Sequence, residues 1–292
     1  MDFLTLGSQL LIGLSRAMLL FIVASGLTLV FGVLRVINFA HGSFYMIGAF
    51  LAYTIALSLG GGPAGFWGAL LIAPLAVAFL SLVIERFLLR LIYKREHLMQ
   101  MLLTYSLVLI FGDAVKMLWG TQYKSIPVPE SLSGSFVFLG AALPRYNAFL
   151  LLVGPLVAVG LWYLLSRTKV GKICRATATD REMVDALGVD STRVFAAVFV
   201  LGGWLAGLGG ALIAPTVSIS LGMDVSVIIN AFLVVVIGGL GNIWGALVSS
   251  LLLGVGEAVG VLIWPQMAIV LPFMITAVVL ILKPSGLLKS VW

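Results

Sequence analysis

The chain has 292 residues, of which 62% are hydrophobic and only 10% are charged, whereas a soluble domain has about 25% charged residues. This composition excludes a soluble globular protein. A helix that crosses a bilayer needs about 20 apolar residues, so the length allows eight or nine spans and leaves no room for a separate catalytic domain. The net charge is +6, but the chain has no basic soluble domain that could bind nucleic acid. This argues against nucleic acid as a partner. We expect a single membrane domain over residues 1–292.

The apolar segments predict nine crossings of the membrane. They cover residues 13–34, 37–57, 64–84, 98–119, 147–165, 194–214, 225–240, 243–263 and 267–282. The seventh segment is short for a span and ends in Gly238, Gly239 and Gly241. It therefore either spans the bilayer or forms a broken or re-entrant helix, which is tolerated only inside protein or beside a cavity. The expected fold is an all-α polytopic bundle of eight or nine transmembrane helices.

Basic residues mark one side of this bundle. Twelve of the 17 Lys and Arg residues lie in three short stretches, which are Arg86, Arg90, Lys94 and Arg95; Arg167, Lys169, Lys172, Arg175, Arg181 and Arg193; and Lys283 and Lys289. The positive-inside rule predicts that all three stretches are cytoplasmic. The first apolar run lacks the basic region and cleavage site of a signal peptide, so we expect it to remain as a span. The N-terminus is then outside and the C-terminus in the cytoplasm.

The second basic stretch lies in a predicted cytoplasmic loop, residues 167–193, which contains the pattern of a complete short helix. Thr179 and Glu182 form a Thr-x-x-Glu capping box. Asp180 places negative charge at the helix N-terminus, and Gly188 supplies a left-handed C-terminal stop. The sequence therefore predicts a helix between Thr179 and Gly188, outside the membrane.

This short helix is predicted to be amphipathic. Its apolar face carries Met183, Val184 and Leu187, and its opposite face carries Arg181 and Asp185. An interfacial helix lying on lipid is the alternative interpretation. However, four acidic residues are unfavourable beside anionic lipid, namely Asp180, Glu182, Asp185 and Asp190. Their charge favours a protein partner.

Polar groups inside spans are candidates for a translocation path or its gate, because burying them unpaired is costly. Asn38 and His41, beside Gly42, lie at the mouth of the second span. Alternatively, Asn38 caps that span and His41 binds a neighbouring carbonyl. Glu257 has no basic residue near it in sequence. It is therefore a proton site, a polar lining of the path or a structural cap.

A weak similarity between two parts of the chain adds three more candidate residues to this path. Ile37-Asn38 and Ile229-Asn230 each stand at the entrance to a glycine-rich interrupted segment, as happens in transporters built from inverted repeats. Asn230, Gly238 and Gly239 are therefore included with the path residues. The Gly-x-x-x-Gly pairs of the chain, such as Gly203 and Gly207, are interpreted as tight helix packing within the bundle.

Several kinds of chemistry are not expected. The chain has no Gly-x-x-x-x-Gly-Lys-Ser/Thr phosphate loop, so any ATP would be hydrolysed by another subunit, for which the short helix offers a docking point. Cys174 is the only cysteine, and His41 and His97 are the only histidines, which disfavours disulfides, metal clusters and catalytic triads. We expect no enzymatic activity, no cofactor and no metal.

Three longer stretches carry recognisable motifs: GLTLVFGVLRVINFAHGSFYMIGAF at residues 26–50, RATATDREMVDALGVD at residues 175–190 and NAFLVVVIGGLGNIWGALVSSLLLG at residues 230–254. Together they resemble the LivH-type permease subunits of branched-chain amino-acid ABC importers. The first is close to that family's INFAHG signature, the second to its cytoplasmic coupling segment, and the third to its Gly-Gly-x-Gly-x-x-x-Gly signature. The resemblance extends over nearly the whole chain.

The resemblance implies a type II ABC importer-like permease in a bacterial inner membrane. Its partners would be a second homologous permease subunit, two cytoplasmic ATP-binding subunits, a periplasmic substrate-binding protein and membrane lipid. The residues expected at the ATPase contact are Arg175, Thr179, Asp180, Arg181, Glu182, Met183, Ala186, Leu187 and Gly188. The segment Thr177-Ala178-Thr179 is more polar than the family pattern, which leaves the exact contact open.

The cargo remains open at this level. Family members import leucine, isoleucine and valine, and close relatives carry urea, short amides or other small organic solutes. The small charged fraction of 10% suits a neutral or zwitterionic solute. Two other functions also remain, a proton-coupled secondary carrier that uses Glu257 and a membrane scaffold that transports nothing.

Overall fold

The computed structural model describes residues 3–93, 95–138 and 140–288, so that Lys94 and Lys289 of the basic stretches lie outside the described residues. The described helices are α1 (Phe3–Leu34), α2 (Ala40–Ser58), α3 (Pro63–Ile84), α4 (Arg90–Ile92), α5 (His97–Trp119), α6 (Arg145–Arg167), α7 (Lys169–Thr179), α8 (Arg181–Ala186), α9 (Ser191–Ile213), α10 (Met223–Gly238), α11 (Ile243–Ile263) and α12 (Leu271–Leu282). A π-helical turn, Glu85–Leu89, joins α3 to α4. A short hairpin, β1 (Ser135–Phe138) and β2 (Ala141–Pro144), precedes α6.

Seven of the described helices are long and apolar enough to cross a membrane, and two shorter apolar helices accompany them. The long ones are α1, α2, α3 with its extension to Ile92, α5, α6, α9 and α11. The shorter ones are α10, with 16 residues, and α12, with 12 residues. At 1.5 Å of rise per residue these two measure about 24 Å and about 18 Å, less than the roughly 30 Å of a hydrocarbon core. The all-helical polytopic bundle is confirmed, and each predicted segment corresponds to one helix.

Three local predictions differ from the structure. The first span was expected to begin at residue 13, but α1 already begins at Phe3. The last apolar segment was expected to begin at residue 267, but α12 starts at Leu271, after a 3₁₀ turn at Pro265–Met267. Pro272 stands in the first turn of α12, where its missing amide donor is tolerated. The segment between α5 and α6 lies between two predicted spans and was therefore expected to be a loop. It contains the antiparallel hairpin, in which Ser135 pairs with Pro144 and Phe138 with Ala141. The hairpin segment has no long apolar run that would predict its conformation.

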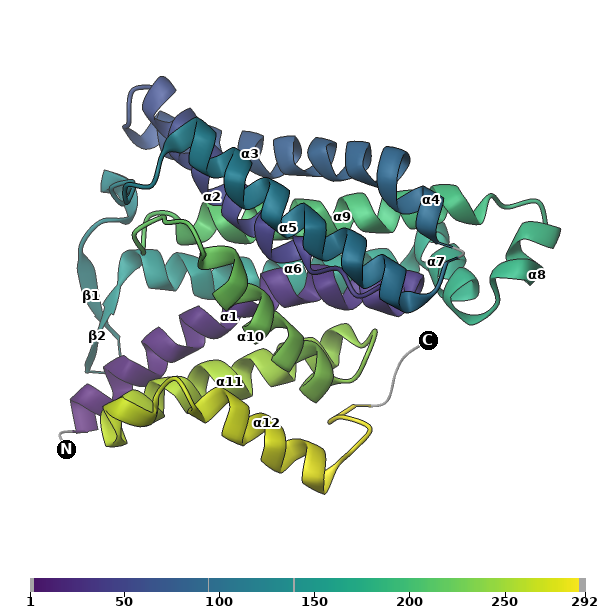
Figure 1. Ribbon diagram of the computed structural model, residues 1–292. Helices are drawn as coiled ribbons and strands as arrows, with labels where there is room; N and C mark the ends of the chain where they lie inside the picture. The colour runs from purple at the N-terminus through teal and green to yellow at the C-terminus, as the bar shows by residue number, and fades with distance from the viewer. Residues whose placement is uncertain (1–2, 94, 139, 289–292) are drawn as a thin grey trace.

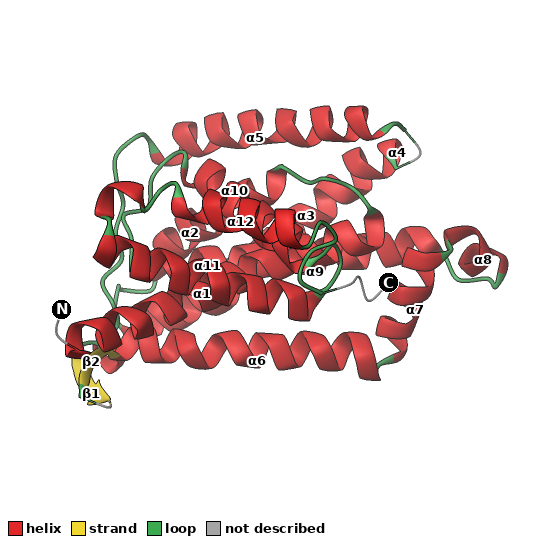
Figure 2. Ribbon diagram, turned by 90° about the horizontal axis from the view of Figure 1, so that it is seen from below, coloured by secondary structure: helices red, strands yellow, loops and turns green. Residues whose placement is uncertain are grey.

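The helices form a central group with other helices around it. In α1, 83% of the most apolar window is buried, whereas in α5 the share is 22%. Figure 2 shows α5 and α6 along opposite edges of the bundle, with α1 and α9 between them. The large side chains at the centre include Phe21 of α1, Phe44 of α2 and Leu205 of α9. Since α5 and α6 leave most of their apolar surface uncovered, they can face lipid or another subunit.

Glycines permit the closest helix crossings. A Cβ atom on Gly48 of α2 would stand 2.7 Å from the Cα of Gly207 in α9. One on Gly238, at the end of α10, would stand 2.5 Å from the carbonyl carbon of Gly245 in α11. Both distances are too short for any side chain, so these positions require glycine. The interpretation of Gly207 as a packing residue within the bundle is confirmed.

The bundle has two distinct ends (Figure 1). One end, called the basic end below, carries α4, α7 and α8. The opposite end, called the hairpin end, carries β1, β2 and the start of α1. An isolated bridge at the hairpin end joins Lys124 to Ile219, so the segment before the hairpin is tied to the loop between α9 and α10.

Candidate functional site

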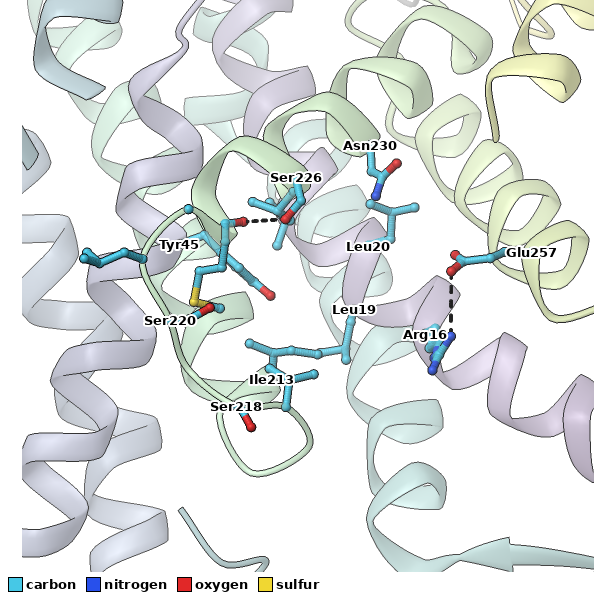
Figure 3. Close-up of a pocket in the computed structure, with 16 residues that line it drawn as sticks. Arg16, Leu19, Leu20, Tyr45, Ile213, Ser218, Ser220, Ser226, Asn230 and Glu257 are labelled. Carbon is cyan, nitrogen blue, oxygen red and sulfur yellow. Dashed lines mark hydrogen bonds and ion pairs between the residues drawn. The ribbon is translucent and has the colours of Figure 1, made fainter. Parts of the chain in front are cut away.

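A pocket of about 600 Å³ opens in the half of the bundle nearer the hairpin end (Figure 3). Helices α1, α2, α10 and α11, the end of α9 and the loop between α9 and α10 form it. Its lining residues are Arg16, Leu19, Leu20, Val23, Tyr45, Ile213, Val217, Ser218, Ser220, Leu221, Gly222, Met223, Ser226, Val227, Asn230 and Glu257. This volume is enough for a small organic solute.

The pocket contains two opposite charges. The Nη1 atom of Arg16, on α1, lies 3.7 Å from the Oε1 atom of Glu257, on α11. Both side chains remain accessible, with 58% and 40% of their surfaces exposed. Charged groups in membrane helices usually face a bundle interior or a water-filled cavity rather than lipid. The geometry therefore gives the pocket one cationic and one anionic group.

Glu257 has a basic neighbour that sequence proximity did not reveal. Arg16 is far from it along the chain, but α1 and α11 cross closely where Gly13 meets Gly254. A Cβ atom on Gly13 would stand 2.9 Å from the Gly254 carbonyl oxygen. The small residues at this crossing bring the two charges together.

The rest of the pocket wall is divided by chemistry. Leu19, Leu20 and Val23 project from the same helix as Arg16 and form an apolar strip. The loop between α9 and α10 contributes the hydroxyls of Ser218 and Ser220, and α10 contributes the amide of Asn230. An apolar strip beside a few polar groups is the usual composition of a site for a small molecule.

Of the predicted path residues, only Asn230 and Glu257 line this pocket. His41 is completely buried, and its Nε2 atom lies 2.9 Å from the carbonyl oxygen of Val23. This contact agrees with the alternative in which His41 binds a neighbouring carbonyl. Since Val23 belongs to the pocket wall, His41 lies directly behind it, and Gly42 packs against the backbone of Asp224.

Asn38 does not cap the second span. Phe39 occupies the position before α2, with no side-chain cap, and Asn38 is 1% exposed. Neither polar atom of the Asn38 amide has a hydrogen-bond partner among the described residues. The capping prediction was wrong because the chain from residue 35 to 38 is not yet helical and directs the amide into the bundle.

Gly238 and Gly239 lie at the turn between α10 and α11, away from the pocket. Gly239 has φ +94°, a conformation that favours glycine. The amide of Leu287 donates to the carbonyl of Ile237 at 2.7 Å. The segment after α12 therefore covers this turn.

At the basic end, the predicted coupling loop holds two helices instead of one. Thr179 is the last residue of α7, and its hydroxyl donates to the Arg175 carbonyl at 3.1 Å. Asp180 caps α8, accepting from the amide of Met183 at 3.0 Å. The predicted Thr179 cap is therefore wrong, because a carboxylate is the stronger acceptor for helix amides. Gly188 has φ +83°, and its expected left-handed conformation is confirmed.

The apolar face predicted for this helix is divided. Val184 is 5% exposed, whereas Met183 is 58% and Leu187 75% exposed. Glu182 and Ala186 are exposed as well. Large apolar side chains held out from the bundle on a short helix are available to another molecule.

A polar network fixes α8 to the start of α9. Asp185 accepts from the amide of Ser191 at 2.9 Å and from its hydroxyl at 3.0 Å. The Nε of Arg181 donates to the same hydroxyl at 2.9 Å, and its guanidinium lies 4.8 Å from the ring centre of Phe195. These contacts hold the exposed side chains of α8 in place.

The end of α1 also contacts this segment. Arg35 donates from Nη2 to the carbonyl of Ala178, near the end of α7, at 3.1 Å. Arg35 has φ +54°, unusual for a residue other than glycine. Arg175 donates to the carbonyl of Leu165, at the end of α6. From the sequence, Arg35 marks only the inner end of the first span, because its only signal is a positive charge after an apolar run.

Comparison with known proteins gives a consistent result over most of the chain. Residues 9–282 match the family model described as "Branched-chain amino acid transport system / permease component". The permease protein BraD of the high-affinity branched-chain amino acid transport system of Pseudomonas aeruginosa is 32% identical over 96% of this chain and 94% of its own length. The corresponding permease protein LivH of Escherichia coli is 28% identical over 98% and 96%.

A probable branched-chain amino acid transport permease protein LivH of Methanocaldococcus jannaschii is 27% identical over 82% of this chain and 76% of its own length. No solved structure matches the chain.

Proposed function

The chain belongs to the family of branched-chain amino acid transport system permease components, and on this premise we propose that it is the permease subunit of an ABC importer in a bacterial inner membrane. Its cargo is a branched-chain amino acid or a closely related small zwitterionic solute. Its relatives are transport permeases and not enzymes. They are named for branched-chain amino acids, which supports this cargo over urea or a short amide.

The observation that carries the proposal is the exposed apolar surface of α8. A permease that hydrolyses no ATP itself needs a rigid contact with subunits that do. Met183 and Leu187 offer that contact, on a helix anchored through Asp185 to Ser191. An ATP-binding subunit would dock on the segment that contains the nine residues expected from the sequence. Within that segment, Arg175 and Arg181 hold α7 and α8 in place.

The pocket is the part of this subunit that the solute would meet. We infer that Asn230 and Glu257 belong to the translocation path and that Asn38, His41 and Gly42 support its wall from behind. Gly238 and Gly239 lie at the end of α10 that is farther from the pocket. A gate at this turn would open by movement of the backbone, because neither residue has a side chain. A second permease subunit and lipid would cover the outer helices α5 and α6.

The orientation follows from the distribution of charge. The basic stretches near α4 and α7 lie at the same end as α8, which supports a cytoplasmic basic end. The described chain starts at the opposite end, so that the N-terminus is outside. A periplasmic binding protein would then dock at the hairpin end, next to the pocket.

Uptake into proteoliposomes tests this function. The full importer would be reconstituted with its partner subunits, ATP inside and binding protein with labelled leucine outside. We expect accumulation that needs internal ATP and is unchanged by an imposed pH gradient. Accumulation driven by the pH gradient without ATP would instead support a proton-coupled carrier using Glu257.

A second experiment tests the docking surface. The double variant Met183→Asp, Leu187→Asp places charge on the exposed face of α8 while leaving buried Val184 intact. We expect recovery of the ATP-binding subunits with the purified permease to fall at least tenfold. Tyr123→Asp is the matched control, because Tyr123 is 77% exposed but precedes the hairpin at the opposite end. Equal recovery for both variants would contradict docking on α8.

A further inference from the structure

The contact between Arg16 and Glu257 adds little to the stability of the fold around them. Their separation of 3.7 Å allows a single loose contact, whereas an Arg–carboxylate pair of good geometry makes two short parallel hydrogen bonds. No other hydrogen bond to either side chain occurs among the described residues. Exposed pairs of this kind contribute little to stability, so a ligand can separate them at small cost.

Both groups keep unused hydrogen-bonding capacity. A guanidinium has five N–H donors in a planar fork that matches a carboxylate, and a carboxylate can accept several hydrogen bonds from an ammonium. A ligand with only a carboxylate would use Arg16 and leave Glu257 uncompensated. A ligand with only an ammonium would do the reverse. A zwitterion satisfies both groups at once.

The apolar strip lies in a fixed direction from these charges. Leu19, Leu20 and Val23 follow Arg16 at the three-, four- and seven-residue spacing of one helix face, and all three line the pocket. Val227 and Ile213 line other parts of the same pocket. An aliphatic side chain attached close to the two charged groups would rest on this strip. Urea, a sugar or a short amide would leave both charges and the strip without a counterpart.

We propose that Arg16 and Glu257 form a binding subsite for the zwitterionic head of an aliphatic α-amino acid. Arg16 binds the α-carboxylate, Glu257 binds the α-ammonium, and the side chain of the solute packs on Leu19, Leu20 and Val23. This inference rests on the proposed function, because it assigns residues of the permease to the cargo of that importer. It gives the permease its own selectivity for zwitterions, in addition to that of the binding protein.

The first test removes one charge at a time from the full importer in proteoliposomes. We expect Arg16→Gln and Glu257→Gln each to lower the initial rate of ATP-driven leucine uptake at least tenfold at saturating binding protein. Stimulation of ATP hydrolysis by the binding protein should stay within twofold, because docking at both ends is untouched. The matched controls are Asp113→Asn and Lys116→Gln, which remove exposed charges from α5 outside the pocket and should leave uptake within twofold.

The exchanged double variant Arg16→Glu, Glu257→Arg separates this role from a structural one. A purely structural ion pair recovers when its partners are exchanged. In a binding subsite, exchange reverses the positions of carboxylate and ammonium relative to the apolar strip, so we expect uptake to stay below a tenth of the wild-type rate. Recovery to half the wild-type rate or more would overturn the proposal, as would single variants that transport normally.

A binding measurement that does not depend on transport distinguishes loss of the subsite from poor assembly of a variant. Cysteine placed at Ser218, which lines the pocket, should react with a maleimide more slowly when millimolar L-leucine is present. Neither 4-methylpentanoate nor 3-methylbutylamine, which each lack one charge, should slow the reaction. Protection by all three compounds, or by none, would overturn the subsite. Absence of ATP-driven leucine uptake by the wild-type importer would contradict the proposed function itself, and normal wild-type uptake with unaffected variants would contradict only the subsite.

Discussion

The two ends of the bundle each contain an arginine and a carboxylate 3.7 Å apart, but the surroundings of the two pairs differ. At the basic end, Arg181 and Asp185 are four residues apart on α8 and share the hydroxyl of Ser191. At the hairpin end, Arg16 and Glu257 come from two helices and border an open pocket. The same distance therefore accompanies two different roles.

The difference lies in what else each charged group binds. Asp185 accepts the amide of Ser191, a residue that is 1% exposed, and Arg181 stacks on Phe195. Separating that pair leaves buried groups without partners. Separating Arg16 from Glu257 leaves two accessible charges that a solute can bind. We infer that the pair at the basic end maintains structure and that the pair at the hairpin end binds cargo.

The largest effect is expected where the basic end meets its partner. Gly188→Arg places a long cation on the exposed turn after α8, where nothing in the described structure lies within 4 Å of an added Cβ. We expect the variant to insert into the membrane normally. The amount of ATP-binding subunits that co-purify with it should fall at least tenfold. Gly188→Asn is the control, since asparagine tolerates the left-handed conformation better than other residues. Normal recovery with Gly188→Arg would contradict docking at this turn.

The second effect compares the two pairs directly. Asp185→Ala removes the acceptor of the buried Ser191 amide, which costs about 1–3 kcal/mol of local stability. Hydrogen exchange in residues 187–191 should become roughly tenfold faster or more, because about 1.4 kcal/mol changes an equilibrium tenfold. Glu257→Ala should change exchange near the pocket less than threefold, since an exposed pair contributes about 0–1 kcal/mol. Equal changes at both ends would remove the distinction between the pairs.

The smallest effect concerns thiol reactivity at the two ends. Cys174 of α7 is 3% exposed, and burial raises the pKa of its thiol. The thiolate is the reactive form, so the natural cysteine should react with maleimide slowly at neutral pH. The rate should increase as the pH rises toward the raised pKa.

Cysteine introduced at the exposed Ser218 position, in a Cys174→Ala background, should react faster by several fold. A membrane-impermeant maleimide added to intact cells should label it from outside. Fast labelling of Cys174 under the same conditions would contradict both its burial and the cytoplasmic position of the basic end.

The sequence predicted the spans well because the signal for a membrane helix is local. An apolar run of sufficient length defines each of α1, α2, α5 and α9 without information from elsewhere in the chain. The left-handed turn at Gly188 was predictable for the same reason. The prediction failed where two nearby residues compete for one role, as Thr179 and Asp180 do at the start of α8. Helix α7 was missed because its residues are mostly polar and lack a long apolar run.

The candidate site was predicted only in part. Glu257 was selected because charged groups are rare in membrane helices, and Asn230 because Ile229-Asn230 repeats Ile37-Asn38. Both line the pocket. Asn38 and His41 were selected because burying unpaired polar groups in a span is costly. Both are buried in the bundle, and His41 lies behind the pocket wall at Val23. The identity of a polar residue indicates that it needs a partner or a cavity. It does not specify which of the two it has.

By itself, the sequence determined the class of protein, the number of apolar segments, the family and the charge asymmetry between the two ends. These properties depend on composition and on contiguous stretches of chain. Only the tertiary structure decided that Arg16 meets Glu257, since that contact requires α1 and α11 to cross at Gly13 and Gly254. A contact between distant segments depends on how helices pack, and packing is a property of all the helices together.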